Sequence, residues 1–168
     1  MNIEVSVPHG TLLPALIKVV NKTTGPVIEF GGGLFSTPFL HGACYETRRP
    51  LYTIESDKAF YNWLKPFESD YHKVVFVENW DDPSLLKLYA SFHWSVALID
   101  HHPGWRRRQE IKRVASCTDY VVAHDSQPRS EGTYKYSRIY RLFKYRREFG
   151  REKPLTMVFS NIDDLLTL

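Results

Sequence analysis

The sequence has few cysteines, no long apolar run and little net charge, and each scarcity excludes a class of protein. Its two cysteines, Cys44 and Cys117, lie far apart and fit neither a disulfide framework nor a zinc motif, so we expect buried, reduced thiols. No apolar stretch approaches the roughly 20 residues that cross a membrane, and no signal peptide opens the chain. We therefore expect a cytoplasmic protein with no membrane partner.

Internal repeats, low-complexity segments and interdomain linkers are also lacking from the 168 residues. With 43% hydrophobic and 24% charged residues, the composition is that of an ordinary globular protein. This length suffices for one real core and leaves little room for a second lobe. The sequence therefore predicts a single domain over residues 1–168.

The most informative stretch that is present is residues 27–33, Val-Ile-Glu-Phe-Gly-Gly-Gly. A short apolar run, typical of a buried strand, breaks into three glycines, which let backbone approach a ligand closely because they lack a Cβ. Ser36-Thr37-Pro38 then has the hydroxyl and proline of a helix start. A strand, a glycine turn and a helix N-terminus form the nucleotide-binding corner of a doubly wound α/β fold, although an ordinary tight turn accounts for the glycines equally well.

The rest of the chain alternates between strand and helix patterns. Five strand-like runs alternate with helical ones and predict a parallel sheet with helices on both faces. The tail differs, because no helix fits between its two strand-like runs, which should form a hairpin with an antiparallel strand. The predicted strands are 27–30, 51–54, 74–77, 94–99, 120–123, 139–149 and 155–160, and the predicted helices are 11–20, 37–44, 58–64, 81–90 and 104–115.

Ionisable residues stand at the end of each of the first five predicted strands. In parallel α/β sheets the ligand lies outside the carboxyl ends of the strands, so we interpret this polar rim as functional. The residues are Glu29, Glu55, Glu78, Asp100, His124 and Asp125.

In this order and spacing the motifs resemble the class I S-adenosylmethionine-dependent methyltransferases, over residues 10–161, and most closely their small O-methyltransferase-like members. The resemblance implies a Rossmann-like methyltransferase fold whose final hairpin places one antiparallel strand inside the sheet. It also implies that S-adenosylmethionine is the cofactor, held by the acidic-x-Gly-x-Gly turn, the acidic end of the second strand, the loop after the third, and the end of the fourth. The matching residues are Glu29, Gly31, Gly32, Gly33, Glu55, Ser56, Asn79, Trp80, Asp100 and His101. The chain departs from the pattern at residues 35–38, which are larger than usual after the glycines, and in its short length.

The densest ionisable cluster surrounds the predicted ends of the fourth and fifth strands. We expect Asp100, His102, His124 and Asp125 to flank the reacting centre, with a histidine taking the acceptor proton. A divalent metal on Asp100 and Asp125 is an alternative, and Ser126 makes the match to metal-dependent relatives partial. A further alternative is that these histidines only cap a helix or bond within the core.

We predict a methyltransferase that acts on an oxygen of a small or pendant acceptor. A protein that binds or consumes the cofactor without methyl transfer is the first alternative, favoured by the short chain. An RNA methyltransferase is the second, and it rests on the basic tail from Arg129 to Lys153. We interpret that tail as mainly structural, through alternation within a hairpin, and the arginines at 106–108 as a solvated helix face. Nucleic acid is therefore not expected as the principal partner, and a homo-oligomer stays open.

Overall fold

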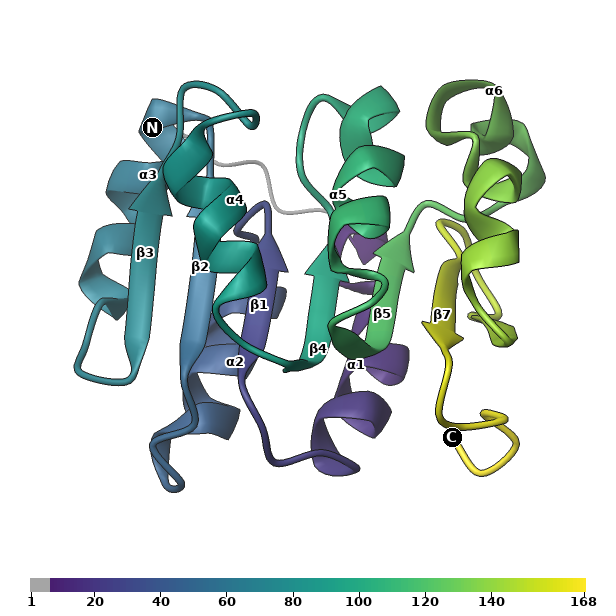
Figure 1. The fold of residues 1–168 in the computed structure, drawn as a ribbon, viewed down its shortest axis with the longest axis horizontal. Coiled ribbons are helices and arrows are strands. Elements are labelled where there is room, and N and C mark those ends of the chain that lie inside the picture. Colours follow the sequence, from purple (N-terminus) through teal and green to yellow (C-terminus); the bar gives the residue numbers. More distant parts are fainter. Residues whose placement is uncertain (1–6) are drawn as a thin grey trace.

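The computed structural model describes residues 7–168, and its centre is a seven-stranded sheet (Figure 1). Its strands are β1 (Val27–Phe30), β2 (Leu51–Glu55), β3 (His72–Phe76), β4 (Trp94–Ile99), β5 (Thr118–His124), β6 (Tyr145–Phe149) and β7 (Thr156–Ser160). The α-helices are α1 (Leu13–Asn21), α2 (Ser36–Tyr45), α3 (Lys58–Leu64), α4 (Pro83–Ala90), α5 (Arg107–Val114) and α6 (Glu131–Tyr134). Short 3-10 helices are η1 (Val7–Gly10), η2 (Lys65–Phe67), η3 (Gly104–Arg106), η4 (Pro128–Ser130) and η5 (Tyr136–Leu142).

The strand order is β3-β2-β1-β4-β5-β7-β6. Strands β1 to β5 are parallel, and β7 lies inside the sheet, antiparallel to both β5 and β6. This topology confirms the predicted doubly wound sheet and its terminal hairpin. The chain reverses its direction of winding between β1 and β4, and such a switch point is where doubly wound sheets bind ligands.

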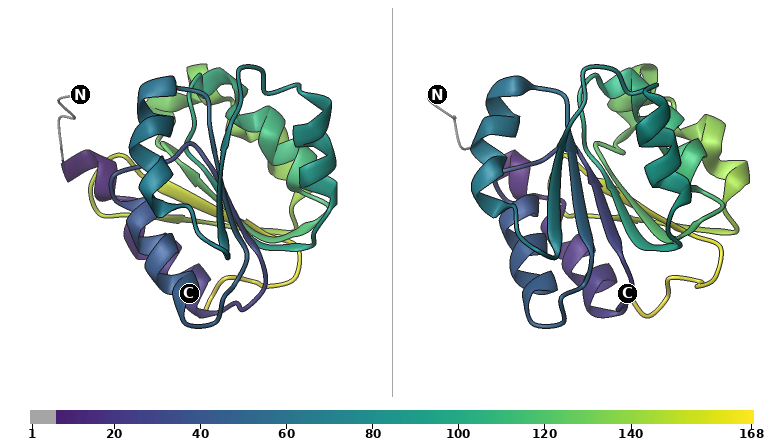
Figure 2. Two further views of the ribbon diagram at one scale, coloured as in Figure 1. Left: turned by 90° about the vertical axis from the view of Figure 1, so that its left-hand side faces the viewer. Right: turned by 60° about the vertical axis from the view of Figure 1, so that its left-hand side comes forward.

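Helices cover both faces of the sheet (Figures 1 and 2). Helices α1, α2 and α3 lie on one face, and α4, α5 and η5 lie on the other. Because successive strand side chains point to opposite faces, β4 contributes to two cores: Val96 and Leu98 pack toward α1, whereas Ala97 and Ile99 pack toward α4 and α5. The central strands are buried on both sides, which explains their continuous apolar runs.

The helix starts follow the expected capping chemistry in one place and depart from it in another. Helix α4 begins as predicted, with Pro83 in its first turn and the Asp82 carboxylate accepting a hydrogen bond from the Ser84 amide. The predicted hydroxyl cap of α2 is wrong, because the N-cap position falls on Phe35, which forms no side-chain cap. The Thr37 hydroxyl accepts instead from the Gly33 amide, so it stabilises the glycine turn.

The predicted strand over residues 139–149 is wrong in its first half. Residues Tyr136–Leu142 form the 3-10 helix η5, and only Tyr145–Phe149 pair as β6. Tyr136 and Ile139 are buried three residues apart, which is the period of a 3-10 helix and brings both side chains against the sheet. The other predicted elements are present, with ends shifted by a few residues.

Both cysteines are unpaired; Cys44 is buried as expected, and Cys117 is half-buried. No helix within residues 7–168 has the length and apolar character needed to cross a bilayer.

Candidate functional site

The glycine turn brings the end of β1 against the end of β4. Gly31 has a φ of +85°, and its amide donates to the Ile54 carbonyl at 2.8 Å. A Cβ at this position would lie 2.5 Å from the Cα of His101, a distance that real structures do not show. The first glycine of the turn is therefore required by close packing of backbone on backbone, in a conformation that L side chains rarely adopt.

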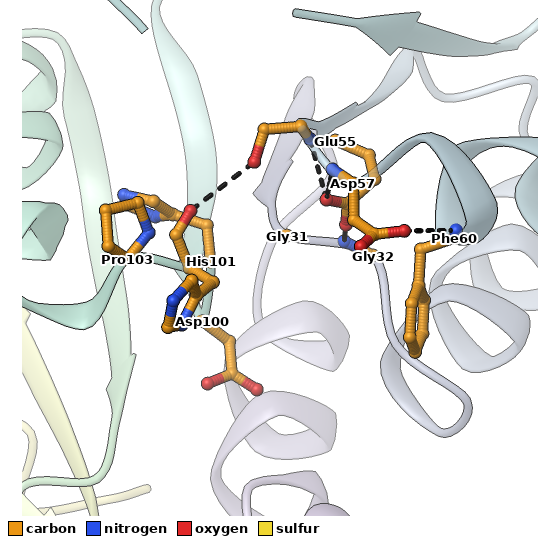
Figure 3. A pocket seen from close by; sticks show the side chains of 10 residues that line it. Gly31, Gly32, Glu55, Asp57, Phe60, Asp100, His101 and Pro103 are labelled. Carbon is orange, nitrogen blue, oxygen red and sulfur yellow. Dashed lines mark hydrogen bonds between the residues drawn. The ribbon is translucent and has the colours of Figure 1, made fainter. Parts of the chain in front are cut away.

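A pocket of about 410 Å³ opens beside this turn, at the carboxyl ends of β1, β2 and β4 (Figure 3). Its size falls within the range of small-molecule sites. It lies at the topological switch point, where a ligand is expected. The residues lining it are Gly31, Gly32, Glu55, Ser56, Asp57, Phe60, Asp100, His101, His102 and Pro103.

Glu55 projects from the end of β2 into the wall of this pocket (Figure 3). Its Oε1 accepts from the amides of Ser56 and Asp57 at 2.6 and 2.7 Å, and its Oε2 accepts from the Gly32 amide at 3.1 Å. Burial raises the pKa of Glu55 above its ordinary value, and the three amides oppose that rise. The carboxylate thus joins the β2 loop to the glycine turn, and no described residue forms an ion pair with it.

His101 forms the floor of the pocket next to the glycine turn. The ring is 1% exposed, its centroid lies 4.3 Å from that of Trp80, and both ring nitrogens lack a hydrogen-bond partner among the described residues. Burial, followed by the charge of Arg107, lowers the pKa of His101 to about 3, so the ring is neutral. The Nε1 of Trp80 is likewise buried without a partner. Unpartnered buried polar atoms are rare in proteins and are often satisfied by a ligand or water.

Glu29 lies beneath the glycine turn and does not line the pocket. It is fully buried, and its Oε2 accepts hydrogen bonds from the hydroxyls of Thr37 and Thr53 at 2.8 and 2.7 Å. Burial raises the pKa of Glu29 to about 7, although the neighbouring hydroxyls lower it. Its visible role is to connect β1 with β2 and with the start of α2.

The other predicted cofactor residues are divided between two places. Gly32 and Ser56 line the pocket, whereas Gly33 lies further along the turn. Asn79 is exposed, lines a second hollow beside the start of α4, and accepts from the Asp81 amide through its side chain. Trp80 is buried against His101, as described above.

The structure brings Asp100, His124 and Asp125 together, with one ligand atom from each within 4.8 Å of the others. Nδ1 of His124 lies 3.3 Å from Oδ1 of Asp100, and its Nε2 lies 3.0 Å from the Thr11 hydroxyl. The ring is only 4% exposed, so both of its nitrogens are engaged within the protein. His102, by contrast, is exposed and lines the pocket.

Arg107 is the residue of this cluster that the sequence-based interpretation missed. Its guanidinium lies 2.9 Å from Oδ1 of Asp100 and 2.9 Å from Oδ2 of Asp125. Burial alone would raise the pKa of Asp100, but the charge of Arg107 and the bond with His124 hold it below its ordinary value. The interpretation of residues 106–108 as a solvated face is therefore wrong at Arg107, which is buried. Helical spacing was the available signal, since Arg107 shares a face with Ile111 and Val114, which pack on the sheet.

No protein-family model matches this sequence, and no curated protein matches it. Solved structures do match its fold. The N-terminal domain of human METTL16 in complex with SAH is 13% identical, with a TM-score of 0.65 over 96% of this chain and 73% of that one. The human METTL16 catalytic domain in complex with an RNA hairpin from the MAT2A 3′UTR is 14% identical, with a TM-score of 0.60 over 97% and 73%. A candidate O-methyltransferase from Klebsiella pneumoniae is 14% identical, with a TM-score of 0.63 over 96% and 83%.

At such low identity these matches establish architecture. The chain has the fold of the class I S-adenosylmethionine-dependent methyltransferases.

Proposed function

We propose that this protein binds S-adenosylmethionine in the pocket beside the glycine turn and transfers its methyl group to an acceptor. The fold supports a methyltransferase in general, and the pocket supports this cofactor in particular. S-adenosylmethionine supplies a methyl group on a positively charged sulfonium. The sections of the pocket that would hold it come from the ends of β1, β2 and β4.

The charge of the pocket is the observation that carries the proposal. Glu55, Asp57 and Asp100 line it, and none of its ten described lining residues is a lysine or an arginine. Such a site favours a cationic ligand, whereas a dinucleotide pyrophosphate would be repelled by the carboxylates. The unpartnered nitrogens of His101 offer further polar contacts to a ligand at the same wall.

Glu55 is the residue that would hold the ribose hydroxyls. Three backbone amides already fix its carboxylate, so it is preorganised and retains acceptor capacity toward the pocket. A hydroxyl donating to a carboxylate forms a charge-assisted bond, stronger than a neutral one. Gly31 and Gly32 would let the ligand approach the backbone of the turn.

His102 is the group best placed to take a proton from the acceptor. It is exposed and lines the pocket, whereas His124 is buried with both nitrogens engaged. A neutral imidazole offers one ring nitrogen as an acceptor, which suits removal of a proton from a hydroxyl. His124 and Asp125 would then orient Asp100 beside the pocket. A small or pendant hydroxyl compound is the acceptor we propose.

RNA is a second candidate acceptor, because the explanation expected for the basic tail does not hold. In β6 residues 146–148 are all exposed, so alternate burial does not account for the charges there. Arg147 donates to the carbonyls of Leu165 and Leu168, which is a structural role. Arg138 and Arg141 on η5 are exposed and form no ion pair with any described residue. Binding of RNA oligonucleotides with a steep salt dependence would favour this acceptor over a small molecule.

The cofactor assignment is tested by calorimetric titration of S-adenosylhomocysteine into wild type and Glu55→Gln. The substitution keeps the shape of the side chain and removes its charge, so we expect binding to weaken by about 1.5–3 kcal/mol, or roughly 10- to 150-fold. Glu78→Gln is the matched control, because Glu78 is exposed after β3 and does not line the pocket. Equal affinities for wild type and a folded Glu55→Gln protein would refute the placement.

Mass analysis of the adenosine-containing product then separates transfer from its alternatives. The demethylated sulfide means methyl transfer, and a different fragment means that the cofactor is consumed in another way. Unchanged cofactor, in the presence of candidate small acceptors and RNA, means binding alone.

A further inference from the structure

The two aspartates at the ends of β4 and β5 are already bound to a cation that the protein itself supplies. Resting on the methyltransferase function proposed above, we propose that the Asp100–Asp125 pair is a site for the Arg107 guanidinium and not for a divalent metal. Arg107 is then the positioning residue that fixes the ends of β4 and β5 beside the pocket.

The Arg107 guanidinium donates four hydrogen bonds to these two strand ends and forms an ion pair with each aspartate. Its Nε donates to the His101 carbonyl at 2.9 Å, and its Nη2 donates to the Asp100 carbonyl at 3.0 Å and lies 2.9 Å from Oδ1 of the Asp100 carboxylate. Its Nη1 donates to the Asp125 carboxylate at 2.9 Å and, more weakly, to the His124 carbonyl at 3.4 Å. Four of the five donors of the arginine are therefore used within the protein.

One oxygen of each aspartate is already bound by donors of the protein. Oδ1 of Asp100 is shared between Arg107 and Nδ1 of His124, and Oδ2 of Asp125 accepts both from Arg107 and from the Tyr134 hydroxyl at 3.0 Å. A divalent ion bound through these oxygens would compete with their donors, and an ion bound through the other oxygens would still lie beside the positive charge of Arg107. The residues present therefore do not fit the metal site that the Asp-His-Asp grouping suggests.

Packing prevents the guanidinium from moving aside. The Tyr134 ring covers it, with the guanidinium carbon 4.7 Å from the ring centroid. Gly104 contacts the other part of that ring so closely that a Cβ would lie 2.2 Å from Cε1 of Tyr134. The arginine side chain is 9% exposed. Helix α6 thus places Tyr134 over the arginine and against Asp125, which follows β5.

The test is a titration of wild-type protein with Mn²⁺ alone. The EPR signal of free Mn²⁺ measures how much is bound, and paramagnetic broadening of the Arg107 side-chain Nε–H signal in NMR measures whether it binds near this residue. We expect no broadening of this signal below millimolar Mn²⁺. Broadening at lower concentration that is lost in Asp125→Asn would overturn the proposal, and this arm needs no arginine variant.

The complementary arm is Arg107→Ala, which removes the guanidinium and leaves the two carboxylates. We expect this variant to bind Mn²⁺ at least tenfold more tightly than wild type, and the gain to disappear in Arg107→Ala/Asp125→Asn. Arg108→Ala, at the adjacent position on α5, should show no gain. A folded Arg107→Ala protein that gains no Mn²⁺ binding would contradict the assignment. S-adenosylhomocysteine binding, measured on the wild-type sample, reports separately on the cofactor, so failure of the proposed function is distinguished from failure of this inference.

Discussion

Glu29 beneath the glycine turn should make the stability of this protein depend on pH in an unusual direction. It is a fully buried carboxyl group with two hydroxyl donors on Oε2 and no hydrogen-bond partner on Oε1 among the described residues. Burial raises its pKa from 4.5 to about 7 in the folded state. Between these values the native protein holds a proton that the unfolded chain has released.

The sign follows from this difference in proton binding. The stability contributed by neutral Glu29 is fully present below pH 4.5 and is lost as the pH rises through 7. Each pKa unit corresponds to about 1.36 kcal/mol, so the loss amounts to about 3 kcal/mol. Glu29→Gln cannot ionise, and its stability relative to wild type should therefore rise by about 3 kcal/mol between pH 4.5 and pH 8.

Urea denaturation followed by circular dichroism, at several pH values on both proteins, measures this difference. The change with pH in the stability difference between the two proteins reports on Glu29, because an effect of the new amide that does not depend on pH leaves this change unaltered. The comparison with wild type is needed because His72 also titrates in this range. Burial, with the charge of His41, lowers the pKa of His72 to about 4, so its contribution to the free energy of unfolding rises with pH in both proteins. A stability difference that stays constant within about 0.5 kcal/mol would refute the reasoning, since Glu29 would then ionise normally.

Two further predictions concern the packing around the site. Gly31→Ala should lower the free energy of unfolding by about 2–4 kcal/mol in urea denaturation, because it adds a Cβ at positive φ and against the backbone after β4. Gly42→Ala is the control: a Cβ there meets open space, so this substitution should be neutral or slightly stabilising. Glu110→Ala should cost about 1.5–3 kcal/mol, because Arg106 and Arg113 lose the bonds to its buried carboxylate and keep only those to the exposed Asp81. Lys112→Ala, at an exposed position of the same helix, is the control. A loss of stability in Glu110→Ala no larger than in Lys112→Ala would show that the pairing of Glu110 with the arginines does not stabilise the fold.

The parts of the fold that could be predicted are those with a local cause. Strands such as β4 are buried on both faces and leave a continuous apolar run, and polar residues follow each strand because the chain leaves the core there. Since carboxyl ends of parallel strands share one edge, the position of Glu55 and Asp100 at one pocket could be expected from their order. The 3-10 helix η5 could not, because its aromatic spacing also fits a strand.

The side-chain directions within the site depend on contacts that are distant in sequence. Glu29 follows Val27 by two residues and so points to the face covered by α1 and α2, where it bonds Thr37 and lies away from the pocket. The helical spacing of Arg107 indicates burial but does not identify its partners, Asp100 and Asp125, the second of which lies 18 residues later. Neither the acidic-x-Gly-x-Gly spacing nor a run of three arginines contains this information.

The charges at the carboxyl edge fall into two groups, and this division supports a cationic ligand. Arg107 offsets one of the two negative charges of Asp100 and Asp125, and burial shifts Glu29 toward its neutral form, so these three acids add less negative charge than their number suggests. Glu55 and Asp57 remain, and neither is paired with a cation among the described residues. The end of β2 therefore contributes more unpaired negative charge to the pocket than the cluster at β4 and β5, and it is the place proposed above for the ribose. Loss of Glu55 should consequently affect ligand affinity, whereas loss of Arg107 should affect the geometry and ion preference of the neighbouring strand ends.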